Sequence, residues 1–157
     1  MKLCIQERIF TWGDKFDVTD ENGQTLFYVE GEVFSWGKKL HVYDTRGLEV
    51  AFIQQRLMTF LPRYSVFEGD IEVAEIVKEL SFLSPRYRVD GPGWNIDGEI
   101  FAHSYIIYEG NRTVAAIEKE WFTWGDCYTI DVENPTEAVM ALCVVVTIDC
   151  IDEQRSN

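Results

Sequence analysis

Apolar and polar residues alternate along short segments over most of the chain, and turn residues separate these segments. In the segment around Phe16 and Val18, for example, these two residues fall on one face, and Lys15, Asp17 and Thr19 fall on the other. Alternation with a period of two predicts antiparallel β-strands with one buried face. The pattern predicts about twelve strands, at residues 3–10, 14–20, 25–35, 39–44, 48–58, 61–68, 71–80, 85–90, 94–100, 103–109, 113–122 and 126–133.

Glycines divide this pattern into hairpins. Asn22-Gly23 is a strong signal for a tight hairpin turn. Gly31 interrupts the strand predicted at residues 25–35, and a glycine in that position predicts a bulge or a bend that curves the sheet.

The last segment differs from all the others. Nine consecutive apolar residues, 138–146, are followed by Thr147 and Ile148, so a helix here has no polar face. Such a helix is either buried on every side or in a membrane. A membrane span needs about 20 apolar residues, and this run stops at Asp149. The sequence therefore predicts a buried helix.

The beginning of this helix is marked by Asn134, Pro135 and Glu137, in the spacing of a capping box. The fold that these patterns predict is mainly β, with about twelve antiparallel strands in a sheet that wraps around one hydrophobic C-terminal helix. Residues 1–157 form a single domain in this prediction, with the strands at 3–133 and the central helix at 135–152.

Two internal repeats agree with a succession of hairpins. Residues 10–14, 34–38 and 122–126 carry the same Phe-Ser/Thr-Trp-Gly pattern, and residues 61–66 resemble residues 84–89. A solenoid is the alternative. The irregular spacing of the repeats and the terminal helix, which has no counterpart in them, favour the sheet wrapped around the helix.

Charge and cysteine content limit the classes of function. Fourteen basic and 27 acidic residues give a formal charge of −13, which repels nucleic acid and anionic lipid surfaces at long range. Charged residues near the N-terminus argue against a signal peptide, and a cytoplasmic protein without a transmembrane segment is expected. The four cysteines form no CxxC pair and there are only two histidines, so neither a metal site nor a cofactor is expected, and the thiols are expected to be reduced.

Several segments resemble the LURP-one-related family, in particular its bacterial YxjI-type branch within the Tubby C-terminal-like superfamily. They are the Phe-Thr-Trp-Gly-Asp segments near both ends and residues 28–32, 37–44, 61–64 and 144–149, and the resemblance extends in order over essentially the whole chain. It implies a twelve-stranded closed barrel threaded by a hydrophobic C-terminal helix.

The resemblance implies less about function. Superfamily relatives include the Tubby domain, which binds phosphoinositide headgroups through basic residues, and the phospholipid scramblases, which act at membranes. No Tubby headgroup-binding motif matches this sequence, and the cysteine-rich and membrane-anchoring segments of the scramblases are absent. A shared fold does not by itself transfer a function.

Candidate chemistry is sparse. The sequence has no GxSxG, P-loop or HExxH motif. His41 alternates with Leu40 and Val42, which predicts an outward-facing side chain, and His103 lies beside the weakest predicted strand. Asp149 has two interpretations: a residue at the barrel mouth that accepts hydrogen bonds from backbone N–H groups or arginine, or an acid that faces a ligand.

Basic residues beside the repeats are the candidates for binding an anion or a lipid: Lys38, Lys39, Arg63, Arg86 and Arg88. Either neighbouring hairpin ends gather them into a patch, or they are isolated charges paired with the abundant carboxylates. We expect a non-enzymatic module that binds a protein partner or an anionic phospholipid-type ligand on its outer surface or rims. The alternative is an enzyme or a small-ligand carrier with a cleft at the barrel mouth near Asp149.

Overall fold

The computed structural model of the chain describes residues 1–6, 15–32, 36–122 and 125–156. Within these residues, twelve strands precede one long helix, α1 (Ala138–Ser156). Two 3-10 turns, η1 (Ile100–Ala102) and η2 (Pro135–Glu137), complete the structure. The strands are β1 (Lys2–Gln6), β2 (Lys15–Thr19), β3 (Thr25–Gly31), β4 (Lys39–Asp44), β5 (Glu49–Gln55), β6 (Arg63–Glu68), β7 (Ile71–Glu79), β8 (Arg86–Asp90), β9 (Trp94–Glu99), β10 (Ser104–Glu109), β11 (Arg112–Phe122) and β12 (Gly125–Val132).

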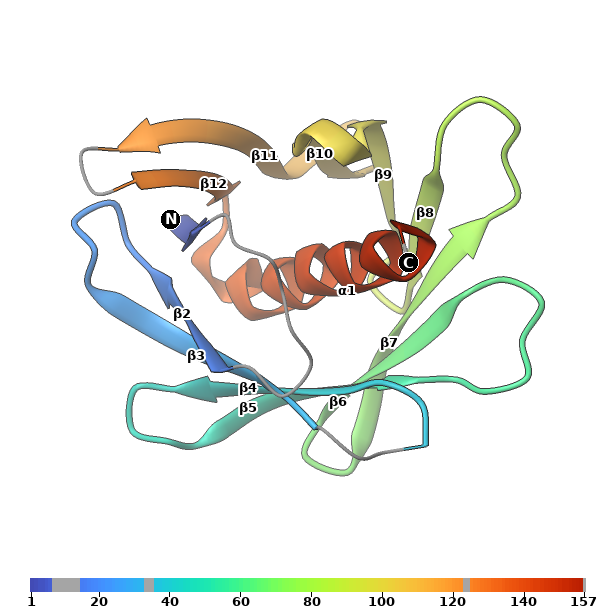
Figure 1. Cartoon of the computed structure of the whole chain (residues 1–157), viewed down its shortest axis with the longest axis horizontal. Helices are drawn as coiled ribbons and strands as arrows, with labels where there is room; N and C mark the ends of the chain where they lie inside the picture. Colours follow the sequence, from blue (N-terminus) through green and yellow to red (C-terminus); the bar gives the residue numbers. More distant parts are fainter. Residues whose placement is uncertain (7–14, 33–35, 123–124, 157) are drawn as a thin grey trace.

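The strands form a closed antiparallel barrel in which each strand pairs with its neighbours in the sequence (Figure 1). Closure joins β1 to β12, whose register runs from Lys2 opposite Asp131 to Gln6 opposite Cys127. Closing the sheet removes the exposed edges that an open sheet would leave unpaired. The predicted fold class is confirmed.

Helix α1 fills the barrel, as Figure 1 shows. All eight residues from 141 to 148 are buried, as expected for a segment without a polar face. The inward residues of the strands, such as Val18, Ile53, Ile76 and Ile130, surround it in one core cluster. The apolar run that distinguished this segment in the sequence is therefore the centre of the hydrophobic core.

The helix differs from its prediction at both ends. It begins with η2 and extends to residue 156 rather than 152. The side chain of Asn134 accepts a hydrogen bond from the N–H of Thr136 at 3.1 Å. Glu137 does not complete a capping box, because its carboxylate binds Arg112, with Nη2 at 2.8 Å from Oε1. The ion pair with a strand residue replaces the local capping contact.

The strand boundaries also differ from the pattern in places. Gly31 ends β3 and pairs in regular register with Leu40, so of the two predicted features, a bulge or a bend, the bulge is not found. Register shifts occur instead near tight turns, at Val18/Thr19, Val42/Tyr43, Val66/Phe67 and Ile107/Tyr108. Residues 7–10 of the first predicted strand, residues 10–14 of the first repeat and parts of the other two repeats lie outside the described residues.

Because successive strands alternate in direction, their connections alternate between the two ends of the barrel. The turn end comprises the short connections at 20–24, 44–49, 68–72, 90–93 and 109–112 and the connection to α1 at 133–137. These six segments carry eleven Asp or Glu and two Arg. The loop end comprises the described parts of the connections between β3 and β4, β5 and β6, β7 and β8, and β9 and β10, together with the end of α1. Within the described residues no helix has the length and apolar character needed to cross a membrane.

Candidate functional site

A cavity of about 120 Å³ opens at the loop end, beside the last turns of α1. Its described lining comes from β1, β2, β12, α1 and the connection before β10, and comprises Ile5, Gln6, Phe16, His103, Tyr128, Val146, Asp149, Cys150, Asp152 and Glu153. The walls are mainly apolar, with carboxylates on the α1 side. We refer to this cavity as the mouth cavity.

Asp149 lies in the mouth cavity between two partners from other elements. Nε2 of His103 donates to its Oδ1 at 3.0 Å, and the hydroxyl of Tyr128 donates to its Oδ2. The rings of His103 and Tyr128 stack, with their centroids 4.1 Å apart and their planes within 3°. Asp149 thus lies at the mouth, as one interpretation expected, and its side-chain partners among the described residues are a histidine and a tyrosine.

The backbone around η1 positions His103. His103 adopts a left-handed conformation with φ of 48°, and its N–H donates to the carbonyl oxygen of Ile100 at 3.1 Å. A non-glycine residue in this conformation costs free energy, which surrounding contacts must offset. The stacking on Tyr128 and the bond to Asp149 are such contacts.

Burial and the charge of Asp149 govern the nearby titrating groups. Burial raises the pKa of the Tyr128 hydroxyl well above its ordinary value, and the negative charge of Asp149 raises it further. The same two causes raise the pKa of Tyr105, whose hydroxyl has no hydrogen-bond partner within the described residues. Burial and Asp149 also raise the pKa of Asp152 and of the Cys150 thiol. The tyrosine and cysteine side chains therefore remain protonated at neutral pH.

The described lining of the mouth cavity contains no activated nucleophile. An imidazole held by a carboxylate resembles part of a catalytic triad. However, the described lining offers the hydroxyl of Tyr128, which already donates to Asp149, and the Cys150 thiol, which stays protonated. A thiol needs a lowered pKa to act as a nucleophile. No group of three or more potential metal ligands occurs among the described residues.

The five basic candidates are spread over two regions of the barrel. Lys38, before β4, has its pKa lowered by burial, and Lys39 lies 3.9 Å from Glu32. Arg63 on β6 pairs with Glu75 at 2.7 Å. The guanidinium of Arg88 on β8 lies 3.0 Å from a carboxylate oxygen of Asp90 and 4.0 Å from one of Glu79. The exposed Arg86 has no carboxylate within ion-pair distance in the described structure. The structure brings Arg63 and Arg88 to one groove and leaves the two lysines at the start of β4.

Two loops at the loop end expose large apolar side chains. Residues 56–62 connect β5 to β6 and residues 80–85 connect β7 to β8. The exposed side chains are Leu57, Met58, Phe60, Leu80, Phe82 and Leu83, with relative exposures of 53%, 104%, 94%, 69%, 97% and 100%. We call these six residues the hairpin rim.

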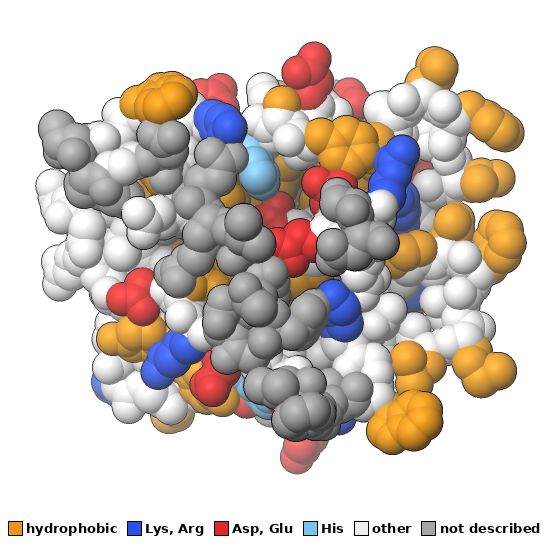
Figure 2. Space-filling view, viewed as in Figure 1, with side chains coloured by type: hydrophobic (Ala, Val, Ile, Leu, Met, Phe, Trp, Pro, Cys, Tyr) orange, Lys and Arg blue, Asp and Glu red, His pale blue; other side chains and the backbone are white. Residues whose placement is uncertain are grey.

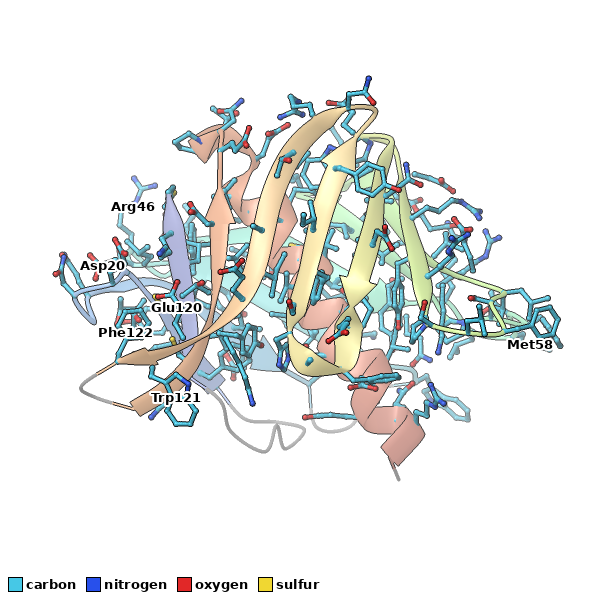
Figure 3. All side chains as sticks on the ribbon, turned by 90° about the horizontal axis from the view of Figure 1, so that it is seen from above. Asp20, Arg46, Met58, Glu120, Trp121 and Phe122 are labelled. Carbon is cyan, nitrogen blue, oxygen red and sulfur yellow. The ribbon has the colours of Figure 1, made fainter. Side chains whose placement is uncertain are left out.

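The two loops of the hairpin rim flank one open groove, which is lined by Thr59, Phe60, Leu61, Arg63, Val77, Lys78, Glu79, Leu80 and Arg88. In Figure 2, apolar side chains follow the right-hand edge of the molecule, where Figure 1 places these loops. Figure 3 shows Met58 at the outermost point of its loop, pointing away from the barrel. Phe60 of one loop and Leu80 of the other both line this groove.

Only part of these sites could be predicted from the sequence. The sequence singles out Asp149, because a carboxylate within an apolar run needs a partner. It does not identify His103 and Tyr128 as the partners, since they lie 46 and 21 residues from Asp149 and form no motif with it. The hairpin rim was also missed. A feature of the sequence could have indicated this surface. Residues 56–67 and 80–89 contain four arginines and no Asp or Glu, although the chain as a whole is strongly acidic.

The closed barrel of twelve antiparallel strands, filled by its own C-terminal helix, defines the structural class of this protein. The sequence profile of the family described as LURP-one-related matches residues 1–149, and the chain belongs to that family. The family resemblance drawn from the residues is confirmed.

Two relatives fit this assignment. YxjI of Bacillus subtilis (strain 168), described as uncharacterized, is 29% identical over 159 residues, covering 99% of this chain and 98% of the relative. An X-ray structure of an Arabidopsis thaliana protein matches with a TM-score of 0.66 and 20% identity over 95% of this chain and 90% of that chain. At this identity the second match shows a common fold and nothing more.

Proposed function

We propose that this chain is a single-domain, non-enzymatic binding module of the cytoplasm that docks through the hairpin rim. The observation that carries the proposal is the exposure of six large apolar side chains on two loops that flank one groove. Six large apolar side chains exposed on two neighbouring loops are more than the isolated surface residues of an ordinary folded protein, and such a concentration commonly marks an interaction site. The predicted protein partner or anionic phospholipid-type ligand would contact this surface.

The packing of the barrel supports a binding role over catalysis. Residues 141–148 of α1 occupy the interior, so the core offers no room for a substrate. At the mouth cavity, the raised pKa of Cys150 keeps its thiol protonated. A function that uses the outside of the barrel is compatible with both features.

Site-specific photo-crosslinking tests this proposal. A photoreactive phenylalanine analogue is placed at Phe82 and, as the matched control, at Ile71, which is 69% exposed at the turn end. The full chain is expressed in its own cells and irradiated. We expect a discrete adduct with lipid or protein at position 82 and little at position 71. Equal or absent crosslinking at the two positions would overturn the proposal.

A small-ligand carrier is the second candidate, because the mouth cavity places Asp149 beside an opening of about 120 Å³. A cavity of roughly 150 Å³ holds a molecule the size of benzene. The test is a thermal-shift screen of small polar compounds against the wild type and Asp149→Asn. The carrier hypothesis expects a compound that raises the melting temperature of the wild type but not that of the variant. A screen without such a compound contradicts it.

A further inference from the structure

We infer that the hairpin rim docks on a lipid bilayer that carries anionic headgroups, with the two loops entering the membrane interface. The inference rests on the proposed function and names the partner of the same surface. Three independent features of the described residues lead to it: the shape of the loops, the distribution of charge along the barrel and an exposed tryptophan beside the loops.

The apolar side chains project singly rather than forming a flat face. Met58 and Phe60 on one loop, and Phe82 and Leu83 on the other, have exposures between 94% and 104%, so they have almost no packing contact with the barrel. A protein partner would need a separate matched pocket for each side chain to bury it. A fluid bilayer adapts to any projecting shape and buries all four without such pockets.

The two loops of the hairpin rim are the part of the loop end that suits an anionic surface, because carboxylates of this end lie at the mouth cavity, as Asp149, Asp152 and Glu153, and in the groove, as Glu79. Residues 56–67 and 80–89 carry Arg56, Arg63, Arg86 and Arg88 and no carboxylate. Three of these arginines, Arg56, Arg63 and Arg88, form ion pairs with carboxylates of β7 and β8. Arg86 and Lys78, which lines the groove, have no carboxylate within ion-pair distance in the described structure.

The opposite end of the barrel carries eleven carboxylates and two arginines in its connections. The net charge of −13 would repel an anionic membrane if it were spread evenly. Its concentration at the turn end instead favours an orientation in which the turn end points away and the hairpin rim faces the bilayer.

Trp36 adds an anchor at the depth of the headgroups. Its side chain is 89% exposed, and it lines an open groove together with Leu57 and Arg56. Tryptophan is enriched at membrane interfaces because its ring is apolar and its N–H is polar. Apolar tips, arginine and tryptophan thus lie in one region of the surface.

Vesicle flotation of the purified full chain tests the inference. Vesicles contain phosphatidylcholine alone or with about 30% phosphatidylglycerol. We expect the wild type to float with the anionic vesicles, and the double variant Phe82→Ser, Leu83→Ser to lose at least about tenfold in affinity. Ile71→Ser, at the turn end, controls for the loss of an exposed apolar residue.

A second pair of variants tests the contribution of charge. Arg86→Gln should weaken binding to the anionic vesicles several-fold, while Arg46→Gln at the turn end should not.

The outcomes separate the inference from the proposed function. If the wild type floats with neither vesicle, or if the rim variants bind as tightly as Ile71→Ser, the bilayer is not the partner. A protein adduct at position 82 in the crosslinking experiment would then leave the proposed function intact. Equal binding to neutral and anionic vesicles would overturn the requirement for anionic headgroups. Circular dichroism of each variant establishes that the fold is retained.

Discussion

His103 and Asp149 are 46 residues apart in the chain, yet Nε2 of His103 lies 3.0 Å from Oδ1 of Asp149. This contact joins the connection between β9 and β10 to the last turns of α1. The guanidinium of Arg155 lies 5.2 Å from the centroid of the Phe101 ring and links the same two elements. Two side-chain contacts therefore hold the end of the central helix to the connection between β9 and β10, and one of them, His103 with Asp149, lies in the mouth cavity.

Removal of the Tyr128 hydroxyl should destabilise the fold. Tyr128→Phe deletes the donor to a carboxylate that is only 25% exposed, and hydrogen bonds to charged groups contribute about 1.5–3 kcal/mol. Urea unfolding should show a loss in this range. Tyr28→Phe, on the outer side of β3, should change the free energy of unfolding by less than about 0.5 kcal/mol. A loss at Tyr128 no larger than this control contradicts the assigned role.

Gly98 allows the close pairing of β9 with β10. At its φ of +133°, a Cβ atom would lie 2.7 Å from the carbonyl oxygen of Ser104 and from the Cα of Tyr105. Gly98→Ala should therefore cost more than about 2 kcal/mol. Gly110→Ala, with no atom within 4 Å of the added Cβ, tests the backbone effect alone and should cost about 1 kcal/mol. Equal losses in thermal unfolding would show that β10 adjusts freely.

His41 should make stability depend on pH. Burial lowers the pKa of His41, but hydrogen bonds to Glu32 and Glu49 outweigh it, and the pKa in the folded state is raised. The stabilisation is thus fully present below the unfolded pKa of about 6.5 and is lost as the pH rises through the folded pKa. His41→Gln should destabilise the protein more at low than at high pH. Urea unfolding at about pH 5.5 and pH 9 measures this; a pH-independent difference contradicts it.

The four cysteines should resist modification in the folded protein. All four are buried, and burial raises the pKa of Cys4 and of Cys143 to about 12. Thiolate is the reactive form, so little is present at neutral pH. A colorimetric thiol assay should detect no rapid reaction in the native protein and four thiols in guanidinium. Rapid reaction of a native thiol would show that the core opens readily.

A charge in the middle of α1 should prevent folding. Val145 is fully buried, and Val145→Asp places a carboxylate in the core without a partner. We expect loss of soluble expression. Ile71→Asp introduces the same charge at an exposed position of the turn end and should be tolerated. A folded Val145→Asp protein with an unchanged melting temperature would show that α1 is not central to the core.

The sequence by itself determined the elements and the fold class. Alternation with a period of two identified the strands, and the nine apolar residues at 138–146 identified a helix that must be buried on all sides. Both signals are local, since they depend on which residues neighbour each other in the chain. Asp149 was singled out for the same reason, because it ends that apolar run.

The tertiary structure alone decided which residues meet. The register and closure of the barrel bring Tyr128 and His103 to Asp149, and they place Phe60 and Leu80 on either side of one groove. Strand direction also sorts the connections into two ends, so that acidic turns lie opposite the hairpin rim. These relationships arise from pairing between distant segments, which no local pattern of apolar and polar residues specifies.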